Sequence, residues 1–493
     1  MADSEESPSS LLAPYYQNQS CDPFTPQSKT CELGKYAVYS VNASSAADVA
    51  AAVKFSRSKN IRLAIKNTGH DFLGRSAGTG SLSVWVHNLK THEFFPNYTS
   101  EFYNGTALKF GAGIRGFEAV KVAHRHTVQV VTGFCPAVGV IGGYLQGGGS
   151  RPLGSFRGVA ADQVLEYEAV TASGNLITAS STQNSDLYWA LSGGGGGTYA
   201  IVVSTTIRAF EDVPIGGASL TFSRQNVETH LVYDLLGQVF DLVSSLIDVG
   251  VQFAREITKK SFHMGPVTAP GFNAQQVREL LAPFTSRLEA SGIVYELHVT
   301  EMPNYKSHLD EYLGPMPAGR YQANTMPGTT LIPRDSLRIN RTALVEVTKR
   351  ITEDSASFVV FIAANLEGSK TKEAVAANAV PPQWRQAAVH ALGMLMWDFN
   401  IPHEEMLARH TEFIDFTVPQ LKAALPHHAG TYLNEAHVGI KNWRDEFFGV
   451  NYERLRHIKK VYDPSDLFYA EYSVGSEAWF RASDERLCRT LQP

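Results

Sequence analysis

The chain has 493 residues, of which 44% are hydrophobic and 18% are charged, which is typical of a folded globular protein and excludes disordered, coiled-coil and collagen-like classes. The length predicts two or three structural units. The net charge of −5, without a long run of Lys or Arg, favours a small-molecule partner and indicates neither nucleic acid nor a membrane surface.

Cysteine and sequon patterns favour a secretory or extracellular location. No stretch of about 18 or more consecutive apolar residues occurs, so we expect no transmembrane helix. Residues 1–6 are acidic and lack the apolar segment of a signal peptide. Cys21 and Cys31 lie in a Pro/Gln/Ser-rich loop, where we expect a disulfide that leaves Cys488 as a free thiol, although two buried thiols remain the alternative. Five glycosylation sequons begin at Asn18, Asn42, Asn97, Asn104 and Asn340.

The first two fifths of the chain predict an α+β unit. A capping-box pattern at Ser45 and Asp48 begins a helix that should continue to Lys59. A strand at 61–65 follows, and one clear helix covers 117–124. Short β-rich runs alternate with Gly-rich turns at 81–86, 107–110, 128–131, 164–171 and 201–207.

The middle of the chain has a different texture, because glycine becomes rarer and longer amphipathic helices begin near residues 235–243 and 277–281. A strand-like run at 358–363 lies between such helices. A second α+β domain is therefore predicted over 213–430. Near the C-terminus, apolar residues at helical spacing predict a helix over 452–462 that Pro464 ends.

A glycine pattern at 111–116 matches the fingerprint of NAD-binding folds. That fold needs an acidic residue about twenty positions later for the ribose, and between Gly116 and Asp162 the only acidic residue is Glu118, in the first helical turn. We therefore do not expect NAD binding.

Two further patterns suggest other chemistries that the context does not support. The nucleophile-elbow pattern at 74–78 precedes a strand-like run, whereas a hydrolase elbow precedes a helix. The histidines at 124, 126, 403, 427 and 428 lack the additional ligands at metal-site spacing, so no metal site is expected.

Two segments with small residues form the most informative combination. Residues 66–76 (KNTGHDFLGRS) leave a strand into a turn whose backbone N–H groups suit an anion such as pyrophosphate. Residues 133–149 (GFCPAVGVIGGYLQGGG) have many glycines and few large side chains, so a flat ligand can approach the backbone.

These segments resemble the flavin-binding domain of the vanillyl-alcohol-oxidase superfamily, and specifically its fungal berberine-bridge-enzyme-like branch. The resemblance continues through 158–165, 186–197, 451–455 and 462–464. It therefore covers both ends of the chain and implies a two-part PCMH-type FAD-binding domain, made of 1–212 and 431–493. The α+β domain at 213–430, an antiparallel sheet covered by helices, would be the inserted substrate domain.

The resemblance also implies an FAD that is attached twice, from His70 to the flavin 8α-methyl carbon and from Cys135 to ring carbon 6. Valine at position 138 resembles the oxygen-reactive members of the family. The remaining residues expected around the cofactor are Lys66, Asn67, Thr68, Gly69, Asp71, Gly74, Gly139, Gly142, Gly143, Gly147, Gly158, Asp162, Gly196, Ile201, Val202, Asn451 and Tyr452.

The implied activity is an oxidase, in which a secondary-metabolite alcohol or amine gives a hydride to flavin N5 and O2 becomes H2O2. One departure from the fungal pattern is Ser150-Arg151, where relatives usually carry His-Ser. A non-redox isomerase or cyclase that uses the same pocket for acid/base chemistry, and a non-catalytic flavin-binding protein, therefore remain alternatives.

The acid/base chemistry is assigned to Tyr432 and Glu435, with Tyr144 opposite. Residues 431–436 are predicted to form the closing strand of the substrate domain, over the flavin face that meets the substrate. Alternation along a regular strand would direct Tyr432 and Glu435 to opposite sides, so one of them would be structural unless a bulge intervenes. For Tyr144, ring packing is the alternative role.

Overall fold

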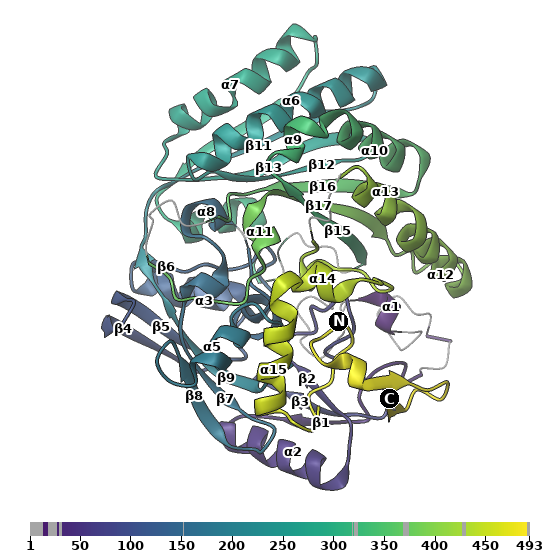
Figure 1. Cartoon of the computed structure of the whole chain (residues 1–493). Helices are drawn as coiled ribbons and strands as arrows, with labels where there is room; N and C mark the ends of the chain where they lie inside the picture. Colours follow the sequence, from purple (N-terminus) through teal and green to yellow (C-terminus); the bar gives the residue numbers. More distant parts are fainter. Residues whose placement is uncertain are drawn as a thin grey trace.

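A computed structural model describes residues 13–17, 27–28, 32–150, 152–317, 319, 324–367, 374–425 and 430–490. Figure 1 shows two halves. The middle of the chain builds a large sheet with helices on its outer side, and the two ends of the chain together build the other half. This mixed architecture confirms the predicted α+β class.

Three short parallel strands open the first half in the order β1-β3-β2. Their bounds are β1 (Tyr39–Asn42), β2 (Leu63–Lys66) and β3 (Leu82–Trp85). Helix α2 (Ala46–Lys59) makes the crossover that parallel strands require. At its start the Ser45 hydroxyl accepts the Asp48 N–H at 3.2 Å, and the Asp48 carboxylate accepts the Ser45 N–H at 3.0 Å. The predicted capping box is confirmed.

A five-stranded antiparallel sheet completes most of the first half, in the order β4-β5-β9-β7-β8. Its central strand β9 is buried along its whole length, as a run of Ile, Val and Thr predicts. Helix α3 (Gly116–Arg125) contacts the short strand β6, and helix α5 (Ser185–Leu191) contacts the edge strand β8. The strands are β4 (His92–Thr99), β5 (Asn104–Gly111), β7 (Val164–Val170), β8 (Leu176–Ser180), β9 (Ile201–Arg208) and the pair β6 (Val128–Gln129) with β10 (Phe210–Glu211).

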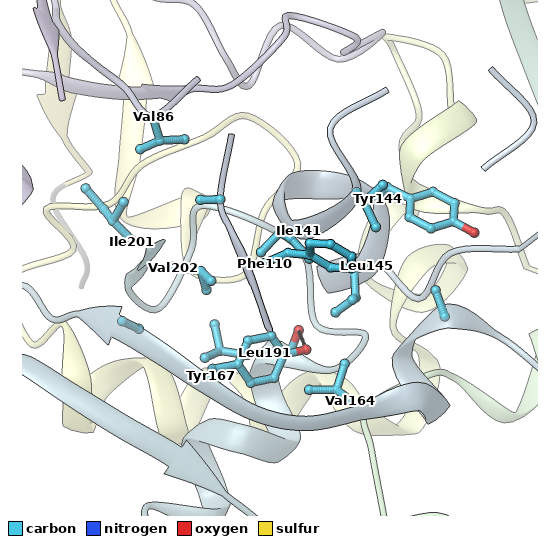
Figure 2. Packing of buried hydrophobic residues seen from close by; sticks show 14 of the residues in the cluster. Val86, Phe110, Ile141, Tyr144, Leu145, Val164, Tyr167, Leu191, Ile201 and Val202 are labelled. Atoms are coloured by element: carbon cyan, nitrogen blue, oxygen red, sulfur yellow. Dashed lines mark hydrogen bonds between the residues drawn. The ribbon is translucent and has the colours of Figure 1, made fainter. Parts of the chain in front are cut away.

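An apolar core lies beneath the glycine-rich segment (Figure 2). Ile141 and Leu145 of that segment belong to the same buried cluster as Tyr167 and Val202 of the sheet. The buried Tyr167 hydroxyl donates to the Leu191 carbonyl at 3.2 Å, so its polar atom is satisfied. The core therefore fixes the position of a backbone segment that has few side chains of its own.

The middle of the chain forms a seven-stranded antiparallel sheet in the order β14-β11-β13-β12-β16-β17-β15. The strands are β11 (Ile215–Ser223), β12 (Gln252–Ile257), β13 (Ser261–Pro270), β14 (Glu296–Met302), β15 (Thr325–Pro333), β16 (Ser357–Ala363) and β17 (Ala387–Met396). Figure 1 shows the long helices on its outer side, whereas α8 (Tyr305–Leu313) contacts β11 and β14 from the side of the first half, so most of the inner face is left to meet that half.

Helices α6 (Thr229–Asp248), α7 (Ala274–Ala290) and α10 (Arg341–Asp354) cover the outer face. By length and composition α6 could cross a membrane, and it is the one such helix among the described residues, but more than half of it is buried within the protein. Its apolar side belongs to the core of this half, which is the usual role of such a helix in a folded domain.

An arginine lies inside this core. Arg255 of β12 is fully buried, with its guanidinium carbon 4.4 Å from the ring centroid of Phe240 and 4.6 Å from that of Phe361. Within the described part of the chain, its side-chain nitrogens have no hydrogen-bond partner. Burial lowers the pKa of Arg255 to about 9, and the two aromatic rings supply cation–π contacts to its guanidinium group.

The C-terminal residues return to the first half. Helix α15 (Tyr452–Tyr462) confirms the predicted helix, and Arg454 lies 3.9 Å above the Trp189 ring. Lys459 and Asp463 form a buried ion pair at 2.8 Å. The same ammonium group donates to the carbonyl of Thr198, directly after the five-glycine run, at 2.9 Å. The exact domain boundaries stay a prediction.

Short elements connect these units. They are α1 (Pro14–Gln17), η1 (Val140–Tyr144), α4 (Gly154–Arg157), η2 (Ala160–Gln163), α8 (Tyr305–Leu313), α9 (Ser336–Ile339), α11 (Pro382–Gln386), α12 (His403–Glu412), η3 (Phe413–Thr417), α13 (Val418–Ala423), η4 (Leu433–Glu435), α14 (Trp443–Phe447), η5 (Gly449–Asn451), η6 (Ser476–Ala478), β18 (Trp479–Arg481) and β19 (Leu487–Arg489). Cys488 lies in β19 outside any disulfide, whereas Cys21 and Cys31 lie outside the described residues, so their pairing stays a prediction.

Candidate functional site

A cavity of about 930 Å³ lies where the inner face of the seven-stranded sheet meets the first half. The two glycine-containing segments line one wall, and strands β12, β13, β16 and β17 line the other. The predicted site residues on its walls are Asn67, Thr68, Gly69, His70, Asp71, Cys135, Val138, Gly139, Gly142, Gly143, Tyr144, Gly196, Ile201, Val202, Tyr432 and Glu435. The structure thus brings most of the predicted site together.

The turn after β2 is organised by one carboxylate. Asp71 accepts the backbone N–H of Leu73 at 3.2 Å and that of Ser76 at 2.7 Å. It also pairs with Arg75 at 3.2 Å. Because Asp71 satisfies these donors and Gly69 adopts a φ of +86°, the turn holds residues 67–71 against the cavity.

His70 and Cys135 lie on the walls of this one cavity. The His70 side chain is enclosed, and burial lowers its pKa to about 3, so the imidazole is neutral over the ordinary pH range. A neutral imidazole has a ring nitrogen with a lone pair. The Cys135 side chain is only 8% exposed. Both residues can therefore act as nucleophiles toward a ligand in the cavity, with the cysteine reacting as its thiolate.

Glycines keep this wall of the cavity flat. A Cβ atom on Gly196 would lie 3.0 Å from the Gly143 Cα, and one on Gly139 would lie 2.1 Å from the Asn67 amide nitrogen. The Asn67 amide is held in place because it donates to the Ala112 carbonyl at 2.7 Å. Larger residues at these positions would displace neighbouring backbone or the Asn67 amide, so these glycines allow the segments to pack closely. Because they also line the cavity and have no side chains, the wall offers backbone to a ligand at these positions.

Gln146 supplies an independent test of whether a flavin fits. Its Nε2 donates to the Ile141 carbonyl at 3.1 Å, while its Oε1 is buried without a hydrogen-bond partner among the described residues. Leaving such an acceptor unsatisfied costs about 1–3 kcal/mol. Gln146 lines the cavity, and the isoalloxazine ring of FAD carries an N–H donor. The flat wall, the two nucleophiles and this acceptor fit FAD.

The predicted strand at 431–436 is wrong. Residues 433–435 form η4, a single 3₁₀ turn in which the Glu435 N–H donates to the Tyr432 carbonyl at 3.0 Å. A 3₁₀ helix has three residues per turn, so side chains three positions apart lie on the same side. Tyr432 and Glu435 therefore both line the cavity, which a regular strand would have prevented.

Asn434 connects this turn to the opposite wall. Its Nδ2 donates to the carbonyl of Gly143 at 2.8 Å and lies 2.9 Å from the Tyr432 hydroxyl. Its Oδ1 accepts Arg75 at 3.2 Å. A Cβ atom on Gly147 would lie 2.5 Å from the Asn434 amide nitrogen, so this glycine makes room for Asn434 and does not line the cavity.

Aromatic and ionic contacts fix Tyr432 and Glu435. The Tyr432 ring stacks on Trp384 with 4.3 Å between centroids and meets His390 edge-on at 5.7 Å. The His390 Nδ1 lies 3.3 Å from the Glu435 carboxylate. His390 of β17 thus touches both predicted acid/base residues, so the three side chains form one connected group.

Tyr144 packs more tightly than an acid/base group needs. A Cβ atom on Gly133 would lie 3.2 Å from its ring, and one on Gly149 would lie 2.9 Å from it. Figure 2 shows the ring at the margin of the apolar core. These contacts favour the ring-packing role, although Tyr144 also lines the cavity.

Asp162 does not line the cavity. The residue is only 4% exposed. Its carboxylate forms an ion pair with Arg385 at 2.6 Å and accepts a hydrogen bond from the Asn378 amide at 2.7 Å. Both partners come from the segment around α11. Asp162 therefore ties the two halves together, which is a role different from the predicted cofactor contact.

The other predicted residues outside the cavity also have local roles. Lys66 is buried, and its Nζ lies 5.9 Å from the ring centroid of Tyr36. Burial lowers the pKa of Lys66 to about 8. Gly74, at a φ of +69°, faces the Tyr16 ring so closely that a Cβ atom would lie 2.3 Å from it. Gly158 ends α4 at a φ of +84°.

Two C-terminal residues of the predicted site make structural contacts outside the cavity. Asn451 donates to the Ala379 carbonyl at 3.1 Å. The Tyr452 hydroxyl lies 2.8 Å from both carboxylate oxygens of Glu477. Neither residue lines the cavity.

The glycine pattern at 111–116 and the nucleophile-elbow pattern at 74–78 have structural explanations. In the 111–116 pattern, a Cβ atom on Gly111 would lie 2.3 Å from the Leu89 carbonyl, and one on Gly113 would lie 2.0 Å from the His87 carbonyl. These glycines therefore serve close packing. The segment after 74–78 continues into β3, with no helix directly after it.

Sequence reasoning missed Arg75, Gln146, Trp384, His390 and Asn434 as site residues. His390 gave the clearest signal, since it is a titratable side chain inside the apolar run of β17. Asn434 gave a weaker one, two positions after Tyr432.

Comparison with known proteins assigns the family. The family described as "FAD binding domain" matches residues 38–180, and the one described as "Berberine and berberine like" matches residues 431–475. The chain is 42% identical to FAD-linked oxidoreductase patO of Aspergillus clavatus, over 98% of this chain and 83% of that protein. It is 40% identical to bifunctional decalin synthase calF of Penicillium decumbens, over 97% and 83% of the two chains.

Solved structures agree. The VAO-type flavoprotein MtVAO615 of Myceliophthora thermophila C1 matches with a TM-score of 0.92 and 40% identity, over 98% of this chain and 87% of that chain. A glucooligosaccharide oxidase of Acremonium strictum, described with 6-S-cysteinyl, 8α-N1-histidyl FAD, shares the fold at a TM-score of 0.72 and 20% identity, over 90% and 93% of the two chains. The chain therefore belongs to the berberine-bridge-enzyme-like branch of the VAO-type flavoproteins, and it is an FAD-dependent oxidoreductase.

Proposed function

We propose that this protein is an oxidase that takes a hydride from a carbinol or amine carbon of a small secondary metabolite, with O2 as the electron acceptor and H2O2 as the product. One observation carries this proposal. A single cavity has His70 and Cys135 on one wall and the Tyr432–His390–Glu435 group at its other side. A substrate in this cavity would lie between the cofactor wall and a proton acceptor.

The same proposal assigns FAD two covalent bonds, from His70 to the 8α-methyl carbon and from Cys135 to ring carbon 6. The neutral state of His70 and the position of both nucleophiles in one cavity support it. Acid-precipitated protein should retain its yellow flavin. His70→Ala and Cys135→Ala should each keep one bond, and only the double variant should release free FAD on denaturation. Full release from the wild type would contradict this assignment.

When bound, FAD supplies the hydride acceptor and the reaction with O2. The chain itself must remove a proton from the substrate hydroxyl or amine. Tyr432 is placed for this because Trp384 and Asn434 fix its ring and its hydroxyl. His390 and Glu435 lie beside it and can accept or return a proton. A positioned base of this kind contributes about 10²–10⁴-fold to the rate.

A second candidate is a cyclase or isomerase that uses the same group of acid/base residues without net oxidation. One observation favours this second candidate: a relative that is 40% identical to this chain is named bifunctional decalin synthase. Anaerobic mixing separates the two functions. Bleaching of the flavin by substrate would establish oxidation, whereas product formed with the flavin still oxidised would establish the non-redox route.

Substrates for that experiment can be found by a screen of alcohols and amines for peroxide release. Tyr432→Phe and Glu435→Gln should then be compared for the rate of flavin reduction, after their covalent flavin content is checked. If both variants stay within about threefold of the wild type, well below the loss expected of a base, the acid/base assignment is refuted.

A further inference from the structure

Polar side chains cross the inner face of the seven-stranded sheet on strands away from Tyr432. Thr221 of β11 pairs with His263 of β13, and His263 pairs with Glu256 of β12, so the three residues share one row and one face. The Thr221 hydroxyl lies 2.8 Å from His263 Nδ1. His263 and Glu256 line the cavity, and Thr221 lies behind them.

The part of this face between Glu256 and the Tyr432–His390–Glu435 group is apolar, whereas the polar residues Gln252, Thr268 and Thr325 line the cavity elsewhere on the sheet. The row continues from Glu256 to Val360 and then to Leu392. Neighbouring rows on the same face add further cavity-lining side chains, which are Phe358, Ile362 and Met394. A ligand that extends from the Tyr432–His390–Glu435 group toward Glu256 therefore meets hydrocarbon side chains until it reaches the carboxyl.

The Glu256 carboxylate has no partner of its own. Within the described residues it makes neither an ion pair nor a hydrogen bond, and desolvation alone raises its pKa. The adjacent Arg255 points into the helix-covered core, because successive side chains alternate across a strand. Lys259 and Lys260 lie in the exposed turn that follows β12. A partly buried carboxyl that lacks a partner is a group that a ligand donor can satisfy.

The sheet sets the distance between this carboxyl and the reacting end of the cavity. Glu256 and Leu392 are separated by two strand spacings, and His390 lies two residues further along β17. With strands about 4.8 Å apart and residues about 3.4 Å apart, the Cα atoms of Glu256 and His390 lie roughly 12 Å from each other.

We propose that Glu256, supported by His263, binds a hydroxyl or ammonium group at the far end of an elongated and otherwise apolar substrate. The end to be oxidised lies beside Tyr432 and Glu435, about 10–12 Å away. This inference rests on the proposed function for the position of the reacting carbon. It deepens that function because it defines a substrate class, namely a hydrocarbon body with a hydrogen-bond donor distal to the oxidised alcohol or amine.

Four linear eight-carbon probes test the inference. All carry one terminal alcohol, and the far end carries a hydroxyl (octanediol), an ammonium group (amino-octanol), a methyl group (octanol) or a carboxylate (hydroxyoctanoate). Binding to the loaded enzyme is measured from the perturbation of the oxidised flavin absorbance, which needs no turnover. Octanediol and amino-octanol should bind about tenfold or more tighter than octanol, and hydroxyoctanoate should bind most weakly.

Variants locate the effect at Glu256. Glu256→Leu should abolish the preference for both donors, whereas Glu256→Gln should keep most of the preference for octanediol and lose that for amino-octanol. Glu296→Gln is the matched control, since Glu296 occupies the same row on β14 but is exposed and outside the cavity lining. Covalent flavin content and unfolding temperature confirm that each variant is folded.

An unchanged ranking in Glu256→Leu, equal binding of octanol and octanediol, or no binding of any probe would each overturn the inference. Tightest binding of hydroxyoctanoate would also overturn it and would assign selection to the lysines at the rim. If the donors bind as expected but never bleach the flavin under anaerobic conditions, the distal site stands and the oxidase proposal fails.

Discussion

Replacement of Asn434 by alanine tests how the acid/base group is positioned. The change removes an amide that lies 2.9 Å from the Tyr432 hydroxyl, donates to the Gly143 carbonyl at 2.8 Å and accepts Arg75 at 3.2 Å. The Trp384 ring still stacks on Tyr432, so we expect the Tyr432 side chain to shift while the protein stays folded. A displacement of about 1 Å can cost about 10²-fold in rate, whereas full loss of a base costs about 10²–10⁴-fold.

We therefore expect Asn434→Ala to reduce flavin about 10²-fold more slowly, with covalent flavin content unchanged. The pH–rate profile should move to higher pH, because the amide N–H stabilises the deprotonated phenol. Anaerobic stopped-flow absorbance across pH measures both effects. Combining the change with Tyr432→Phe should add little, since residues that act as one unit are not additive. Asn451→Ala, which removes one amide contact outside the cavity, is the control.

The reasoning is refuted if Asn434→Ala reduces flavin within about threefold of the wild type and keeps the same pH profile. Loss of covalent flavin in this variant would instead show that Asn434 organises the cofactor wall through its contact with Gly143.

Four further outcomes are expected. Lys459→Met should lower the free energy of unfolding by about 3–5 kcal/mol in chemical denaturation, since it leaves a buried aspartate unpaired, and a loss below about 1 kcal/mol would contradict this. Arg255→Met should keep the fold and leave the free energy of unfolding unchanged or higher in the same assay, because it removes a buried cation that has no hydrogen bonds among the described residues. A large loss of stability would show that the cation–π contacts outweigh the cost of burying the charge. Burial lowers the pKa of His437 to about 3. Between pH 6.5 and 3 the unfolded chain therefore binds a proton at this residue that the folded chain does not bind. Over this range His437 lowers the free energy of unfolding by about 1.4 kcal/mol for each unit by which the pH falls. His437→Asn should flatten that slope in pH-dependent thermal melts, and an unchanged slope would assign it to other groups. If the protein follows the secretory route, glycosidase treatment of material from a secreting host should lower its mass through the exposed sequons at Asn97 and Asn104, and no shift would count against that route.

Local signals explain what the sequence predicted correctly. The α2 start depends on two side chains three residues apart, and β9 depends on its own run of β-branched residues. The small residues of the segments that contain His70 and Cys135 are contiguous in the chain, so the segments stand out in the sequence, while their assignment to a flavin depends on the family resemblance.

The turn at Tyr432 could not be predicted in this way. Its aromatic and apolar residues have strand propensity, and the 3₁₀ turn forms where Asn434 meets the Gly143 carbonyl, 291 positions earlier in the chain. The contact of His390 with Glu435 likewise depends on how β17 sits in a sheet whose strand order does not follow the sequence. Glu256 and His263 become neighbours only through strand register, which periodicity does not specify.

The buried Lys459 contact has a consequence for biosynthesis. It joins the carbonyl after the five-glycine run to a helix that begins at residue 452, so the cofactor-binding half is incomplete until α15 has left the ribosome. The middle sheet is contiguous in sequence and can form earlier, since domains generally fold as units during synthesis. Flavin loading should therefore follow the synthesis of α15, and a chain that stops before residue 452 should yield a protein that acquires no yellow colour.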